Sequence, residues 1–179
     1  MNETSNPEEA SEDGDHGRIP LCPHADCGFR CCQFNHGNYI VMFPGELAAA
    51  RAQGHSTAHL EITAEENGGH RAVCRARETG TCDNGYKPLD CASYPFFPLL
   101  GPQGDSTFAM IRGAKCPLPL DRLDAHASWV QDTWQALLEG SQEIRSWLGG
   151  VELVGYELVP PRALLRKRTV AAPSTSEAK

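Results

Sequence analysis

Cysteine is the residue type that most constrains how this sequence can fold. The chain of 179 residues contains eight cysteines, at Cys22, Cys27, Cys31, Cys32, Cys74, Cys82, Cys91 and Cys116. Four of them fall between residues 22 and 32, and the flanking residues are loop formers such as Pro, His, Asp, Gly and Asn. An isolated buried cysteine behaves as a small hydrophobic residue, but that explanation fits clustered loop cysteines poorly. The fold must therefore accommodate whatever these thiols bind.

The N-terminal sequence bears on the choice between disulfides and metal. The first 15 residues carry six acidic residues and no basic one, whereas a secretory signal begins with basic residues and continues into an apolar run. No stretch of the chain approaches the roughly 20 apolar residues of a membrane helix. We therefore expect a cytoplasmic protein with no membrane partner. In a reducing compartment, metal ligation explains eight cysteines better than disulfides do.

The first cysteine motif has the pattern Cys22-x4-Cys27-x3-Cys31-Cys32. Ligands close in sequence are brought together at little cost in chain entropy. Neighbouring side chains of an extended backbone point in opposite directions, so Cys31 and Cys32 do not suit a single mononuclear ion. A disulfide between them would be strained, because bridged Cα atoms usually lie more than roughly 4.4 Å apart. We expect two neighbouring metal centres or one multinuclear centre.

The second motif, Cys74-x7-Cys82-x8-Cys91, is followed by Cys116-Pro117. These four cysteines could complete the ligation begun by the first four, so all eight are predicted metal ligands. Two histidines, His24 and His36, flank the first motif and could join the set, although loop histidines are common surface residues. Thiolate ligands suit both Zn²⁺ and iron–sulfur clusters, so the ligand type leaves zinc and iron open.

The combination of motifs resembles the YkgJ-like cysteine-cluster family, described as a zinc- or iron-chelating domain. The resemblance covers about residues 22–117, and it implies that the eight cysteines chelate the metal. This chain has longer spacers after Cys22 and Cys27 than the family pattern. The segments that carry the resemblance are Cys27-Gly28, Cys31-Cys32, the helix start Pro44-Gly45-Glu46, Tyr86, Lys87-Pro88-Leu89-Asp90-Cys91 and Tyr94-Pro95.

Composition and periodicity predict one small α+β domain around a cysteine-rich metal centre, with short strands and a C-terminal helical pair. We expect a disordered acidic arm over 1–18, the metal-binding domain over 19–160 with a helical extension over 120–150, and a flexible tail over 161–179. Residues 76–102 are rich in Gly, Pro and Asn and predict mostly loop. The predicted strands are 38–43, 59–63, 70–76, 107–112 and 151–159, and the predicted helices run from Pro44-Gly45-Glu46 to about 53, over 121–139, and from a cap at Ser141 to Gly149-Gly150.

Apolar residues recur at spacings of three and four in the predicted helix over 121–139, which indicates one buried face. The members of this face are Leu123, Ala127, Val130, Trp134 and Leu137. Three tryptophans are interpreted as core: Trp129, Trp134 and Trp147. The aromatic residues that follow Cys91 are also interpreted as core, with an apolar shell around the metal as the alternative; they are Tyr94, Phe96 and Phe97.

Charge and motifs narrow the function. The formal net charge is −7, and the first 15 residues account for six of those charges, so residues 16–179 are nearly neutral and predict no nucleic-acid partner. The basic cluster at Arg162, Arg166, Lys167 and Arg168 is interpreted as a solvated tail. The sequence contains no recognised nucleotide-binding or hydrolase motif. It indicates no substrate or protein partner.

We therefore expect a metal-binding protein that coordinates zinc or iron, in the latter case including an iron–sulfur cluster, without independent catalytic activity. Two alternatives stay open. One is an iron–sulfur protein that transfers electrons. The other is a component of a methyl-transfer enzyme, because flagellin lysine methylases resemble the same domain.

Overall fold

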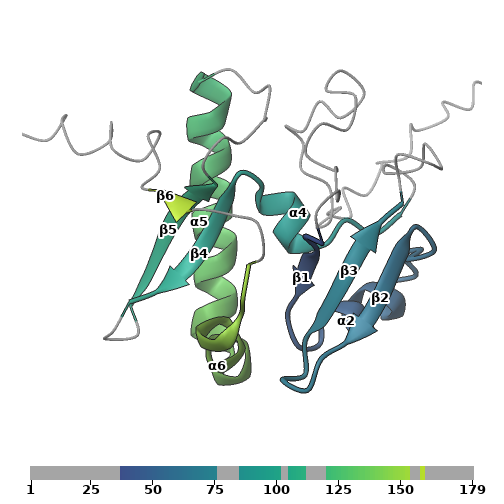
Figure 1. The fold of residues 1–179 in the computed structure, drawn as a ribbon. Coiled ribbons are helices and arrows are strands. Elements are labelled where there is room, and N and C mark those ends of the chain that lie inside the picture. Colours follow the sequence, from purple (N-terminus) through teal and green to yellow (C-terminus); the bar gives the residue numbers. More distant parts are fainter. Residues whose placement is uncertain (1–36, 76–84, 102–104, 112–119, 154–157, 160–179) are drawn as a thin grey trace, which may run out of the picture.

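The computed structural model describes residues 37–75, 85–101, 105–111, 120–153 and 158–159. Over these ranges the chain forms two small antiparallel sheets and four helices in one small α+β domain (Figure 1). This confirms the predicted small α+β domain with short strands and a C-terminal helical pair, and the cysteine-rich metal centre stays a prediction. The predicted arm over 1–18, the predicted tail over 161–179 and most of the cysteine motifs lie outside the described residues.

The first sheet contains β1 (Ile40–Met42), β2 (Leu60–Ala64) and β3 (His70–Cys74), with β3 in the centre. Both neighbours of β3 run antiparallel to it. The helix α2 (Glu46–Ala52) follows β1, and its N-cap Gly45 adopts a left-handed φ of 86° that favours glycine. One small apolar cluster joins the helix to this sheet, and its buried members are Ile40, Met42, Leu47, Leu60 and Ala72.

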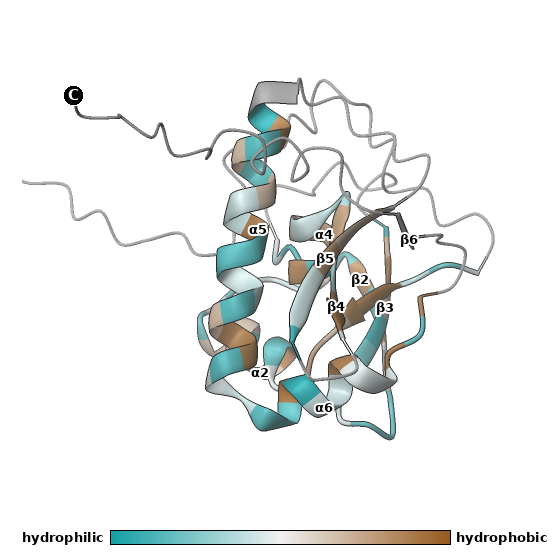
Figure 2. Ribbon diagram, turned by 90° about the vertical axis from the view of Figure 1, so that its left-hand side faces the viewer, coloured by the Kyte–Doolittle hydropathy of each residue, from teal (hydrophilic) through white to brown (hydrophobic). Residues whose placement is uncertain are grey.

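The second sheet contains β4 (Phe96–Leu100), β5 (Ser106–Ile111) and β6 (Leu158–Val159), in that order. The helices α5 (Leu120–Gly140) and α6 (Gln142–Gly150) pack against it. Ser141 caps α6 by accepting a hydrogen bond from Ile144 N at 3.2 Å, as the sequence predicted. Figure 2 shows both hydrophilic and hydrophobic bands along α5, as expected for a helix with one buried face.

The larger core lies between α5, α6 and the second sheet. The predicted buried face of α5 is confirmed at Ala127, Val130 and Trp134, and Trp147 is buried as predicted. The face ends on Leu138 rather than Leu137, which is only partly buried. Phe96 and Phe97 are also buried in this core. Two further predicted core residues, Tyr94 and Trp129, are only partly buried.

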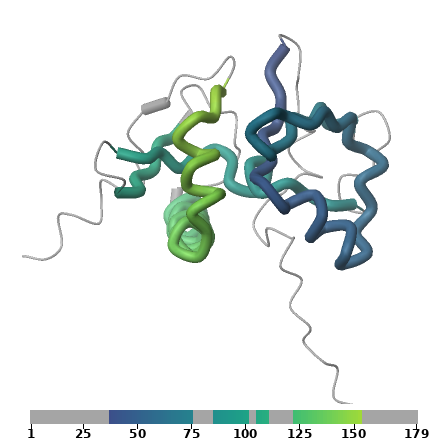
Figure 3. The backbone as a smooth tube through the Cα atoms, turned by 90° about the horizontal axis from the view of Figure 1, so that it is seen from below, coloured from purple at the N-terminus to yellow at the C-terminus, as the bar shows by residue number. Residues whose placement is uncertain are grey.

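The short helix α4 (Leu89–Ser93) lies between the two sheets, next to β1 on one side and to α5 and β4 on the other. Figure 1 shows α4 in this central position, and Figure 3 shows the same teal segment crossing between the blue N-terminal half and the green helices. The predicted loop over 76–102 is therefore wrong where α4 and β4 form.

Prolines in or next to α4 and β4 explain why the sequence analysis predicted loop there. Pro88 precedes α4, where a missing N–H costs no helical bond. Pro98 lies within β4, which is an edge strand of its sheet and therefore tolerates a residue without an N–H. Of the predicted strand over 151–159, residues 151–153 are not strand and residues 158–159 pair with β5, while residues 154–157 lie outside the described part of the chain.

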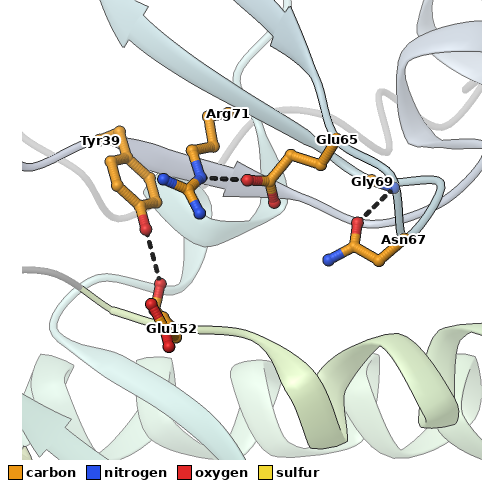
Figure 4. A network of polar contacts seen from close by, with 6 residues as sticks. All are labelled: Tyr39, Glu65, Asn67, Gly69, Arg71 and Glu152. Atoms are coloured by element: carbon orange, nitrogen blue, oxygen red, sulfur yellow. Dashed lines mark hydrogen bonds and ion pairs between the residues drawn. The ribbon is translucent and has the colours of Figure 1, made fainter.

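A second connection between the halves lies at Tyr39 (Figure 4). The Tyr39 hydroxyl donates to the Glu152 carbonyl at 3.1 Å, just after α6. The guanidinium of Arg71 lies over the Tyr39 ring at 4.2 Å and also forms an ion pair with Glu65. This chain of contacts runs from the β2–β3 hairpin to the C-terminal helices. Within the described residues, no helix is both long and apolar enough to cross a membrane.

Candidate functional site

The structure describes two of the eight predicted ligands. Cys74 is the last residue of β3, and Cys91 is the middle residue of α4. Both are partly buried, neither forms a disulfide, and both pack against the small apolar cluster of the first sheet. The other predicted ligands lie outside the described residues: Cys22, Cys27, Cys31, Cys32, Cys82, Cys116, His24 and His36.

Two thiols do not make a complete site, because structural zinc sites have four ligands. Across the described ranges, no group of three Cys, His, Asp or Glu side chains could hold a metal ion. Cys74 and Cys91 nevertheless suit the role by chemistry, and neither residue is fully buried. The convergence of all eight cysteines stays a prediction.

A buried carboxylate, Glu46, fixes the segment that carries Cys91. Glu46 is only 2 % exposed at the start of α2. Its Oε1 accepts hydrogen bonds from Leu89 N at 2.7 Å and from the Tyr86 hydroxyl at 2.8 Å. Its Oε2 accepts from Phe43 N at 3.0 Å. Glu46 therefore joins the β1–α2 corner to the first N–H of α4.

Further contacts hold α4 on both sides. Asp90 Oδ2 accepts from Val41 N at 2.9 Å, which ties α4 to β1. At the C-terminal end, Ser93 Oγ accepts from Trp134 Nε1 at 2.7 Å, which ties α4 to α5. Cys91 thus lies at the centre of a five-residue helix that both halves of the domain hold in place.

Burial dominates the electrostatics of this corner. It raises the pKa of Glu46 to about 7 from its ordinary 4.5, against the three hydrogen bonds that favour the ionised form. It also raises the pKa of Asp90 to about 7, against the hydrogen bond from Val41 N. The pKa of the Tyr86 hydroxyl is raised by burial first, and then by the charge of Glu46 and the hydrogen bond to it. The corner therefore holds carboxyl groups that titrate near neutrality.

The partners of Glu46 determine how it can carry a proton. Two of them are backbone N–H groups, of Leu89 and Phe43, and these can only donate. A hydroxyl can donate or accept, so Tyr86 is the one partner that can reverse its hydrogen bond when the carboxyl is protonated. The Glu46–Tyr86 pair therefore accommodates both protonation states without movement of the backbone.

His126, on the other side of α4, is a buried residue that the sequence analysis did not single out. It is 1 % exposed, and its ring stacks on Trp129 with centroids 5.8 Å apart. Its Nε2 lies 3.0 Å from the Tyr94 carbonyl, which can only accept, so Nε2 carries the proton. Burial lowers the pKa of His126, which indicates a neutral imidazole that supports the end of α4.

The sequence analysis noted Glu46, Tyr86 and Asp90 only as members of motifs that resemble the cysteine-cluster family. Burial and contacts across 40 to 49 positions give them their role here. The position of Glu46 directly after Pro44-Gly45 marks a helix start, but sequence alone does not show which N–H groups its carboxylate reaches. Comparison with family models, with curated proteins and with solved structures finds no match to this chain.

The raised pKa of Glu46 predicts how stability depends on pH. Protonation is favoured in the folded state, so its contribution is complete below the unfolded pKa of 4.5 and is lost as pH rises through about 7. The advantage of the wild type over Glu46→Gln in urea unfolding is expected to shrink by on the order of 2–3 kcal/mol between pH 5 and pH 8.

The quantity to measure is the difference in the free energy of unfolding between the wild type and Glu46→Gln, because other groups titrate in the same pH range. Burial lowers the pKa of His59 and His126, which reduces stability as pH falls below 6.5, and Asp90 acts in the same direction as Glu46. These groups are present in both proteins and largely cancel. A wild-type advantage that stays constant, or grows, from pH 5 to pH 8 would contradict the prediction.

Proposed function

We propose that this chain is a cytoplasmic metal-binding protein that coordinates zinc or iron, including iron in a cluster with sulfide, through cysteine thiolates. The proposed ligands are the eight cysteines, of which Cys74 and Cys91 belong to the described part of the chain. The spacing of the cysteines and the resemblance to the YkgJ-like cysteine-cluster family support the proposal. The bound metal would serve as the centre around which the N-terminal loops fold.

The observation that carries the proposal is the placement of Cys74 and Cys91. They come from different elements, a strand end and a helix, and both contact the same apolar cluster. Both are only partly buried, whereas a cysteine that serves purely as core packing is usually fully buried. A partly buried cysteine that packs against an apolar cluster suits a metal ligand.

Metal analysis of the full chain, purified without oxygen, tests the proposal. The wild type is expected to contain zinc or iron in stoichiometric amounts, and serine at Cys31, Cys32 or Cys91 is expected to remove at least half of it. Serine keeps the size of the side chain but is a far poorer ligand for these metals. Visible absorption separates the metals, since zinc thiolate sites are colourless and iron–sulfur clusters are brown.

Leu138→Ala is the control for loss of stability alone. Leu138 is buried in the larger core, away from both described cysteines, so this variant is destabilised and should keep its metal. A wild type that contains far less than one ion per chain, or whose cysteines are paired in disulfides, would overturn the proposal. So would serine variants that retain full metal content.

A further inference from the structure

We propose that Glu46 is a positioning residue that holds Cys91 in place for metal before the metal binds. The inference rests on the proposed function and goes beyond it, because Glu46 is not itself a ligand. Its carboxylate acts through the backbone of α4. The role follows from four contacts and from the shortness of the helix that carries Cys91.

The helix α4 cannot be stable on its own. It has five residues, and isolated helices shorter than about 12 residues are marginal in water. Its N-cap is Pro88, which makes no side-chain capping bond. The first N–H groups of a helix have no partner inside the helix and need one from elsewhere. Glu46 supplies that partner to Leu89, from 43 positions away in the sequence.

The two residues before Cys91 are both held by the first sheet and its helix. Leu89 is bonded through its N–H to Glu46, and Asp90 is bonded through its carboxylate to Val41 N. Glu46 is itself held in place, because Phe43 N and the Tyr86 hydroxyl also donate to its carboxylate. The backbone that leads into Cys91 is therefore restrained without any contribution from metal.

Replacing Glu46 by glutamine disturbs this arrangement at a predictable atom. The carboxylate accepts bonds at both oxygens, and one oxygen of glutamine becomes an NH₂ donor. That group must then face either Phe43 N or the Leu89 N–H, which are donors as well. If it faces Leu89 N, the start of α4 loses its hydrogen bond. If it faces Phe43 N, the side chain at position 46 loses its own anchor. Either way the restraint on α4 weakens while every cysteine remains. Partners that orient metal ligands typically contribute 10–100-fold to metal affinity.

The test compares zinc affinities of the reduced, metal-free full chain by competition with a chromophoric chelator. Glu46→Gln is expected to bind zinc about 10-fold more weakly than the wild type. Glu66→Gln is the matched control, because Glu66 is exposed in the β2–β3 turn, and its affinity should not change. Cobalt substitution gives a second readout, since thiolate-to-cobalt absorption per ion reports the ligand geometry and should change in Glu46→Gln alone. Equal affinities and spectra in the two variants would overturn the inference.

Alkylation of Cys91 separates this inference from the proposed function. In the metal-free chain, the rate at which iodoacetamide modifies Cys91, followed by mass spectrometry, should rise several-fold in Glu46→Gln and stay unchanged in Leu138→Ala. If the wild type binds no zinc or iron, the proposed function fails, but the alkylation experiment still tests the role of Glu46. An alkylation rate at Cys91 that is the same in Glu46→Gln and the wild type would overturn that role. If Glu46→Gln does not fold, Tyr86→Phe removes one bond from the carboxylate, and the inference fails unless the rate rises at least twofold.

Discussion

Truncating Trp134 to alanine is expected to lower the free energy of unfolding by about 3–5 kcal/mol, the usual cost of removing a buried tryptophan. Trp134 is 1 % exposed in the larger core. The centroid of its ring lies 6.1 Å from that of Phe43 and 6.0 Å from that of Phe97. The variant also loses the hydrogen bond to Ser93 Oγ, which leaves that buried hydroxyl without its indole partner. The loss therefore combines a cavity with a weakened contact to α4.

Urea unfolding, monitored by circular dichroism, measures this change. Trp134→Phe serves as the comparison, because it keeps an aromatic ring in the core but cannot donate to Ser93. It should cost less than the alanine variant, and the difference between the two isolates most of the cavity term. A loss well under 1 kcal/mol for Trp134→Ala would show that this face of α5 is not buried.

Alanine at Gly69 is expected to destabilise the fold by about 1–3 kcal/mol or more, through overpacking. A Cβ at this position would lie 2.3 Å from Trp147 Nε1 and 2.8 Å from the Met42 carbonyl oxygen. Neither neighbour can move easily, since Trp147 is buried in the larger core and Met42 is paired with β3 in the first sheet. Gly69 thus lets the β2–β3 hairpin approach α6 closely.

Gly140→Ala is the matched control for this substitution. A Cβ at Gly140, the last residue of α5, meets no atom within 4 Å. Alanine there should be neutral or slightly stabilising, because it lowers the conformational entropy of the unfolded chain. Thermal unfolding of the two variants compares them directly. Similar midpoints for Gly69→Ala and the wild type would contradict the close packing of Gly69 against Trp147.

Much of the fold could be predicted from local pattern, because several elements carry their signals in short stretches. The apolar spacing around Val130 and Trp134 predicts α5, and Ser141 predicts the start of α6. The alternation near Leu60 predicts β2. In contrast, α4 is too short for periodicity to register, and β4 contains a proline that normally argues against a strand. Tertiary contacts stabilise both elements, and local propensity cannot report those contacts.

The candidate site was predictable only in its ligand chemistry. Counting and spacing cysteines identifies Cys74 and Cys91 as candidate ligands without any knowledge of the fold. The partners that orient them could not be found in this way. Glu46 reaches Leu89 because β1, α2 and α4 meet in space, and no regular spacing in the sequence encodes that meeting. A buried glutamate at a helix start, with an unusually high pKa, becomes visible only in the structure.

The anchoring of α4 from two sides also has a consequence for the order in which the chain folds. Its contacts to Glu46, Val41 and Trp134 close loops of 43, 49 and 41 residues. Such loops cost entropy before their contacts return any stability, so contacts of this kind tend to form late. The first sheet can assemble through its own hairpin, and α5 can form locally, before α4 settles between them. The segment that carries Cys91 is therefore expected to stay open to solvent, and to any metal present, until the last stage of folding.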